Sequence, residues 1–322
     1  MSAAPSPYSL ASRRRLGDRL GDVLLRGVTL VSALAVLALL AAVVWKVLEL
    51  AWPSLTEYGL SFLTGETWDP VKKIFGALPF IYGTAMSSLI ALVIATPLAI
   101  AIGLWLSELA PRGVRGLIGS LVEMLAAIPS VVLGLWGILV LGPFLAQHLE
   151  PWLHDKLGFI PIFGAPQATG TGLFTAGLIL TIMVVPIVSS ICRELFLNVP
   201  TELKEGALAL GATRWEMIRG VVFPYSRAGI AAALILGLGR AVGEAIAVTQ
   251  VYGSGTNITL NLFATGDTLG SKIASSYNSA GTNLERSSLV YLAVLLLLVS
   301  LVVNVLAQVI VRRVARRQQG RT

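Results

Sequence analysis

Residues 200–224 read PTELKEGALALGATRWEMIRGVVFP and lie between two long apolar runs of the chain. This stretch is polar, charged and rich in residues that favour helices. A membrane protein that places two short amphipathic helices between its fourth and fifth spans is expected to offer them to a soluble partner. That expectation depends on the number of spans and on the side of the membrane that the stretch occupies.

The composition of the chain indicates a membrane protein. Its 322 residues are 55% hydrophobic and only 13% charged, and the mean hydropathy is +0.80. Soluble domains carry about 25% charged residues, so lipid is the expected solvent. The net charge is +7, but the basic residues flank apolar runs, which indicates membrane topology and not a nucleic-acid partner. One cysteine, Cys192, and two histidines exclude an internal disulfide and argue against a histidine metal site.

Apolar runs of about 20 residues predict membrane-spanning helices. Six such runs are present, so the sequence predicts an all-α polytopic membrane protein with six transmembrane helices. The predicted spans are residues 27–50, 80–106, 117–141, 173–191, 229–251 and 289–311.

The distribution of lysine and arginine predicts the orientation of these spans. With the N-terminus inside, seventeen of the 24 basic residues lie on the cytoplasmic side and five lie outside. Both termini are therefore expected in the cytoplasm. The same assignment places residues 192–228 in the cytoplasm, where a soluble partner has access to them.

Two short helices are expected within residues 200–224. Thr201 is a suitable N-cap for a helix that begins at Glu202, because its hydroxyl accepts a bond from a free backbone N–H. Gly211 is expected to end this first helix. A second helix is expected to start near Thr213 and to end before Pro224, since the residue before a proline disfavours helical geometry.

The fifth predicted span contains two charged residues, Arg240 and Glu244. Counted from an inner boundary near Gly229, Arg240 lies about 16 Å deep, close to the middle of a hydrocarbon core of about 30 Å. An arginine there costs at least about 2.5–3.5 kcal/mol, so it must face protein or water. Glu244 is one helical turn further along the same face. Two interpretations stay open. Arg240 presents its guanidinium to an oxyanion with help from Glu244, or the two residues form a buried structural pair or bind a partner helix.

The 200–224 stretch resembles the coupling loop of binding-protein-dependent ABC importer permeases. The family pattern reads Glu-Ala-Ala, three residues, Gly, nine residues, Ile, one residue, Leu, Pro, and its fixed points stand here at Glu205, Gly206, Ala207, Gly211 and Pro224. Three positions depart from the pattern, namely Gly206 for Ala, Val221 for Ile and Phe223 for Leu. The resemblance implies that this loop docks into an ATPase subunit and transmits its motion. The alternative is an ordinary cytoplasmic loop.

No Gly-Lys pair occurs in the sequence, so a P-loop of the GxxxxGK[ST] kind is absent from it. If ATP drives transport, a separate ATPase subunit must therefore bind the ATP and Mg. No cofactor is expected on this chain itself.

Further segments resemble the PstC family of phosphate permease subunits. They are FLT at 62–64, FGALP at 75–79, IPSVVLGLWG at 128–137 and GRAVGE at 239–244. The resemblance implies the type I ABC importer permease fold. In that fold, a basic tail, the first span and the first outer loop occupy 1–79, the permease domain occupies 80–311, and a basic cytoplasmic tail occupies 312–322.

The same resemblance implies a multi-pass protein of the inner (cytoplasmic) membrane that carries inorganic phosphate past Arg240 and Glu244. The implied partners are a homologous PstA-like permease, PstB-like ATPase subunits, a PstS-like phosphate-binding protein outside the cell, and membrane lipid, with no nucleic acid. A permease for another oxyanion such as sulfate or molybdate, and an ion-driven secondary transporter, stay open as alternatives. A membrane-embedded enzyme is not expected, because the spans contain no nucleophile with a base and no metal cluster.

Overall fold

The computed structural model describes residues 16–319. Within that range, six helices are long and apolar enough to cross a membrane, which confirms the predicted number. These spans are Gly21–Tyr58, Leu78–Leu109, Ser130–Leu157, Leu173–Leu197, Arg214–Gly243 and Asn283–Val309.

Helices make up most of the described chain. In chain order they are α1 (Leu16–Tyr58), α2 (Ser61–Thr64), α3 (Leu78–Leu104), α4 (Arg112–Ala126), α5 (Ser130–Trp136), α6 (Gly142–Phe144), α7 (Glu150–Leu157), α8 (Leu173–Leu197), α9 (Thr201–Ala209), α10 (Arg214–Met217), α11 (Phe223–Gly243), α12 (Ile246–Val251), α13 (Leu269–Ser276) and α14 (Asn283–Gln319). Wider π-helical turns extend or join several of them, at Trp105–Leu109, Gly137–Leu141, Leu145–Leu149 and Ile218–Val222. A small antiparallel hairpin of β1 (Trp68–Asp69) and β2 (Ile74–Phe75) lies between α2 and α3.

The chain divides into two compact units, with the boundary between Glu49 and Leu50. The described part of the first unit is the long N-terminal portion of α1. Its apolar side chains, among them Leu34 and Leu37, are exposed. Exposure of leucine is favourable for a helix whose solvent is hydrocarbon, because lipid tails are equally apolar.

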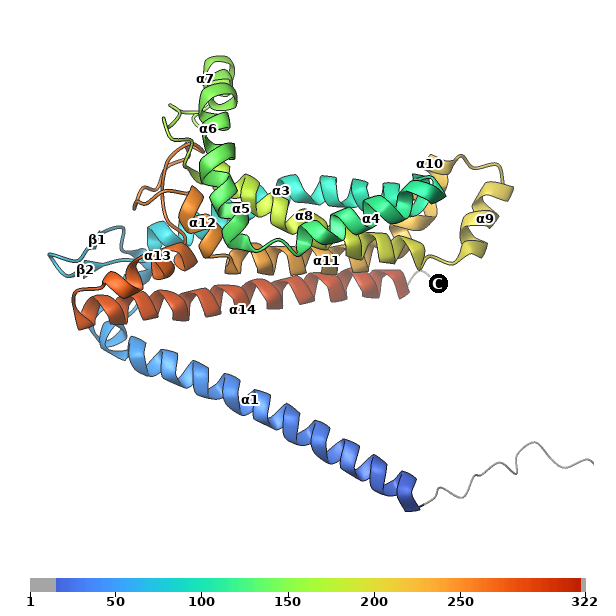
Figure 1. The fold of residues 1–322 in the computed structure, drawn as a ribbon, viewed down its shortest axis with the longest axis horizontal. Helices are drawn as coiled ribbons and strands as arrows, with labels where there is room; N and C mark the ends of the chain where they lie inside the picture. Colours follow the sequence, from blue (N-terminus) through green and yellow to red (C-terminus); the bar gives the residue numbers. More distant parts are fainter. Residues whose placement is uncertain (1–15, 320–322) are drawn as a thin grey trace, which may run out of the picture. The chain divides into compact units, whose positions relative to one another are not determined.

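The second unit is a helical bundle. Helices α3, α8, α11 and α14 run side by side, with α9 and α10 at one end and the β1–β2 hairpin, α12 and α13 at the other (Figure 1). Among the six spans, α8 is the most buried. The bundle therefore holds the two regions singled out in the sequence, residues 200–224 and the α11 charges, on one connected set of helices.

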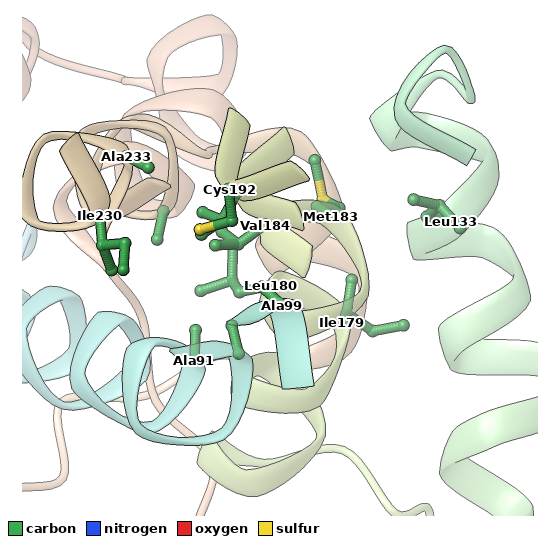
Figure 2. Packing of buried hydrophobic residues seen from close by; sticks show 14 of the residues in the cluster. Ala91, Ala99, Leu133, Ile179, Leu180, Met183, Val184, Cys192, Ile230 and Ala233 are labelled. Atoms are coloured by element: carbon green, nitrogen blue, oxygen red, sulfur yellow. The ribbon is translucent and has the colours of Figure 1, made fainter. Parts of the chain in front are cut away.

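Small side chains on α3 allow it to approach α8 closely. Ala91, Ala95 and Ala99 recur at every fourth position and are fully buried, and Gly103 continues the stripe. A Cβ added to Gly103 would lie 2.9 Å from the Cβ of Cys192 on α8, so the two backbones leave no room for a side chain. Figure 2 shows this packing, with the α3 alanines on one side of the α8 side chains and α11 on another.

The predicted third span, residues 117–141, is wrong as a single helix. Helix α4 ends at Ala126 and α5 begins at Ser130, with Pro129 between them in extended geometry (φ −59°, ψ 138°). Proline has no N–H to donate and its ring clashes with the preceding turn, so the helix stops there. The α5–α7 stretch then turns away from the direction of α4 (Figure 1).

Candidate functional site

Residues 200–224 form the helix–turn–helix that the sequence predicts, at one end of the bundle (Figure 1). Helix α9 ends at Ala209, and Gly211 follows in left-handed geometry with φ +85°. An L-residue in that geometry costs about 1–2 kcal/mol, so glycine suits the turn. The prediction that Gly211 ends the first helix is confirmed.

The caps of the two helices differ from the prediction in one case. Thr201 is already the first residue of α9, Pro200 takes the N-cap position, and no side chain caps the helix. The prediction that Thr201 is the N-cap is wrong. Pro200 has a fixed φ that favours the start of a helix, so α9 begins one residue earlier than expected. Thr213 does begin the second helix: its Oγ1 accepts from the Glu216 backbone N–H at 3.3 Å, and its own N–H donates to Glu216 Oε2 at 2.8 Å.

The sequence predicts that the second helix ends before Pro224, and this prediction is wrong. The helix continues through the proline. The Phe223 N–H donates to the Ile218 carbonyl, which makes the turn of residues Ile218–Val222 a wide π-helical one. In a regular helix the proline ring clashes with the carbonyl four residues earlier, and the wider turn relieves that clash. Arg214–Gly243 is therefore one apolar helix of 30 residues, about 45 Å long. The second helix of residues 200–224 and the fifth span therefore form one continuous helix.

The outer surface of this helix–turn–helix is apolar as well as charged. Leu203, Leu210 and Trp215 are 48%, 91% and 61% exposed. Glu205 and Gly206 are also exposed, and a Cβ added to Gly206 would meet no atom within 4 Å. Such a cluster of exposed apolar side chains indicates a binding surface for another protein.

The inner side of α9 is held by a contact that the sequence did not predict. Lys204 Nζ lies 2.6 Å from Glu108 Oε1 and donates to the Phe196 carbonyl at 2.9 Å. Both charged side chains are largely buried, at 14% and 13% exposure. Ala207, one turn after Lys204, is the other partly buried residue on this side and packs against the core. The only hint in the sequence was an isolated acid at the inner end of an apolar run.

Arg240 lines an open groove between α8, α11 and α14. The groove has a volume of about 550 Å³ and is lined by Ile187, Ile235, Leu236, Gly239, Arg240, Gly243, Glu244 and Asn304. Among residues 16–319, no hydrogen bond or ion pair to the Arg240 guanidinium is present, and the side chain is exposed. Ile187 lies near the middle of α8, so the groove opens at mid-depth of the bundle. The glycines on either side of Arg240 leave the groove open, because neither carries a side chain.

Glu244 shares the groove with Arg240 but not its helix. The expected single span 229–251 is wrong, because α11 ends at Gly243 and Glu244 is extended (φ −75°, ψ 125°). Its Oε1 accepts from the backbone N–H of Ala247, so the carboxylate caps the short helix α12. Within the described chain no ion pair joins Glu244 to Arg240. A carboxylate that caps one helix leaves the guanidinium on another available for a different anion.

Asn304 is a groove residue that sequence reasoning missed. It lies on α14, its Nδ2 donates to the Ser300 carbonyl at 2.9 Å, and its Oδ1 would be 3.9 Å from a Cβ added to Gly239. An amide within the apolar run LVVNVLAQV was a detectable signal. A polar side chain inside a span is costly unless it faces protein or a cavity, and this one faces the groove.

Comparison with known proteins identifies the family. The family model described as "Binding-protein-dependent transport system inner membrane component" matches residues 95–316. A phosphate transport system permease protein PstC from Mesorhizobium japonicum is 41% identical over 92% of this chain and 92% of its own length. This chain belongs to the binding-protein-dependent transport permeases, in their PstC family. The PstC proteins of Pasteurella multocida and Xylella fastidiosa (strain Temecula1) are each 39% identical, over 96% and 98% of this chain and 97% and 98% of their own lengths.

Solved structures support the fold of this family member. A bacterial alginate ABC transporter, solved with an alginate-bound periplasmic protein, is similar with a TM-score of 0.63 and 19% identity, over 94% of this chain and 98% of that one. A second alginate importer structure has a TM-score of 0.56 and 20% identity, over 92% and 99%. The chain is therefore a multi-pass transport permease with the ABC importer fold, and it works with other transporter subunits.

Proposed function

We propose that this chain is the permease subunit of an ATP-driven importer of inorganic phosphate in the inner (cytoplasmic) membrane. Its relatives named as phosphate permeases cover nearly the whole chain. The cargo passes between this subunit and a homologous PstA-like permease, and a PstS-like protein delivers it from outside. Both termini and the α9–α10 hairpin face the cytoplasm, which the excess of basic residues on that side supports.

The observation that carries the proposal is a guanidinium without a partner in a groove at mid-depth of the bundle. Arg240 has no counter-ion within the described chain, although Glu244 lines the same groove. Guanidinium presents a planar fork of donors that matches the oxygens of phosphate. Asn304 adds an amide to the same wall, and its Oδ1 suits the hydroxyl of a protonated phosphate. A structural ion pair is the weaker interpretation, because Glu244, the acid in the same groove, accepts from the Ala247 N–H of α12 and forms no ion pair with Arg240 within the described chain.

In this proposal, the helix that joins the α9–α10 hairpin to the groove couples phosphate transport to ATP hydrolysis. PstB-like ATPase subunits, which hold the ATP and Mg, dock on the exposed face of α9 and α10 that includes Glu205, Gly206 and Trp215. Gly211 sets the angle of the hairpin, and the helix runs without a break from Arg214 through Pro224 to Gly243. When the ATPase subunits close, the helix Arg214–Gly243 moves with them, and the α11 wall of the groove shifts relative to α14. Phosphate is thereby exposed first to the outside and then to the cytoplasm.

The decisive experiment replaces the unpaired cation. In the reconstituted importer, Arg240→Ala is expected to reduce uptake of labelled orthophosphate by about 30-fold or more, the effect of truncating one partner of a desolvated charge contact. The amount of ATPase that co-purifies should stay at the wild-type level. Arg286→Ala is the matched control, since Arg286 is exposed near the start of α14, and it should leave uptake unchanged.

Three results would contradict parts of the proposal. Normal phosphate uptake by Arg240→Ala would reject the role of the cation in the pathway, and loss of assembly would favour a structural role. Uptake of labelled sulfate in preference to phosphate by the wild-type importer would keep the mechanism but change the cargo.

A further inference from the structure

Helix α9 has an unusual attachment to the rest of the molecule. None of its residues is buried, and Leu203 and Leu208 are turned outward, at 48% and 43% exposure. Pro200 precedes it and the left-handed Gly211 follows it. The apolar burial that normally fixes a helix is thus almost absent, and the side chain of Lys204 provides the polar contact with the bundle.

Lys204 connects three elements through one ammonium group. Its Nζ contacts Glu108, in the π-helical turn that continues α3, and the carbonyl of Phe196, in the last turn of α8. Glu108 and Lys204 are 96 positions apart in the sequence. The contact thus joins α9 to two spans that lie beside each other in the bundle.

The burial of this pair sets it apart from surface ion pairs. Its side chains are 14% and 13% exposed, whereas the Lys46–Glu49 pair, with a similar distance of 2.9 Å, is 68% and 53% exposed. Desolvation offsets most of the attraction in a buried pair, so the net gain in stability is small, but loss of one partner leaves an uncompensated charge. Such a pair fixes a geometry more than it stabilises a fold.

We infer that the Lys204–Glu108 pair is a second mechanical link, which carries the movement of a docked ATPase from α9 into α3 and α8. This inference rests on the proposed coupling of α9 and α10 to an ATPase. The first link is the unbroken backbone from α10 into α11. With both links in place, the hairpin moves α11 and the α3–α8 pair together. Without the second, α9 pivots about Gly211 and only α11 follows the ATPase.

The test measures ATP hydrolysed per phosphate imported by the complete importer in vesicles. Lys204→Met keeps the apolar stem without the charge, and Glu108→Gln keeps the shape without the charge. Each is expected to raise the ratio at least about fivefold, the lower range of allosteric coupling, while the ATPase still co-purifies in wild-type amount. Lys204→Arg keeps the cation and should restore most of the coupling. Lys72→Met, in the Lys72–Asp69 pair of the β1–β2 hairpin where Lys72 is 74% exposed, is the control and should leave the ratio unchanged.

The possible outcomes separate the link from a merely structural role. An unchanged ratio in both neutralised variants would overturn the inference while leaving the proposed function intact. Loss of the ATPase from Lys204→Met would also overturn it, since the pair would then serve docking and not transmission. A wild-type importer that moves no labelled orthophosphate would instead reject the proposed function, and the inference with it.

Discussion

Two cations have opposite surroundings: Lys204 lies on α9, at one end of the bundle, and Arg240 lies in the last turn of α11. Lys204 is largely buried and has Glu108 at 2.6 Å. Arg240 is exposed in a groove, and Glu244, which lines the same groove, accepts a hydrogen bond from another helix, α12. Within the described chain, Lys204 therefore has an ion-pair partner, whereas Arg240 has none and is available to a group from outside the chain. For a permease, the first arrangement suits a link between helices and the second suits a passing anion.

The first way to test this contrast is to fill the groove without touching the charge. Gly239→Val is expected to reduce phosphate uptake by about tenfold or more, a cost of at least about 1.4 kcal/mol, because its side chain enters the groove beside Arg240. Among the described residues, a Cβ at this position meets one atom within 4 Å, Asn304 Oδ1 at 3.9 Å, so the fold should tolerate it. The measurement is initial uptake of labelled orthophosphate, normalised to the amount of assembled importer.

Gly237→Val is the matched control for that variant. It lies two residues away, but its Cβ would be 2.8 Å from both Val184 Cγ1 and Val188 Cγ2 on α8. Overpacking of this kind costs about 1–3 kcal/mol, so less importer should assemble while the uptake per complex changes little. If Gly239→Val and Gly237→Val had the same effect on uptake per complex, the groove would not be part of the phosphate pathway.

A smaller effect is expected at the two glycines of the α9 hairpin. Gly211→Ala forces an alanine into φ +85° and should cost about 1–2 kcal/mol, which lowers ATPase-coupled uptake several-fold. Gly206→Ala lies in the helix, where its Cβ meets no atom within 4 Å, and should stabilise α9 by up to about 1 kcal/mol. Binding of the isolated ATPase to vesicles that contain each variant measures both changes. Equal losses from the two alanines would contradict the assigned geometry.

Much of this architecture could be predicted from local sequence. Apolar runs predict spans, because a span must satisfy its backbone within one helix. Gly211 and Thr213 marked the turn and the second helix start correctly, because caps act over three or four residues. Two of the errors arose at prolines, whose outcome depends on the wider structure: Pro129 separates two helices, while Pro224 is accommodated by a π-helical turn. The break of the fifth span after Gly243 lies at no proline.

The site was harder to predict than the fold. Arg240 stood out because a charge in an apolar run is conspicuous. Its lack of an intramolecular partner could not be foreseen, because that depends on the break after Gly243. The Lys204–Glu108 contact spans 96 positions of sequence, and only the packing of α9 beside the end of α3 brings the two side chains together. Local patterns therefore located the charges, and tertiary structure decided which of them are paired.

The proposed coupling requires that the α9–α10 hairpin faces the cytoplasm and is covered by an ATPase. Leu210→Cys tests it most directly, since Leu210 is 91% exposed and the native Cys192 is fully buried and should stay silent. A membrane-impermeant thiol reagent is expected to label the variant in inside-out vesicles, to miss it in right-side-out vesicles, and to be blocked when the ATPase is bound. Labelling in right-side-out vesicles would contradict the account.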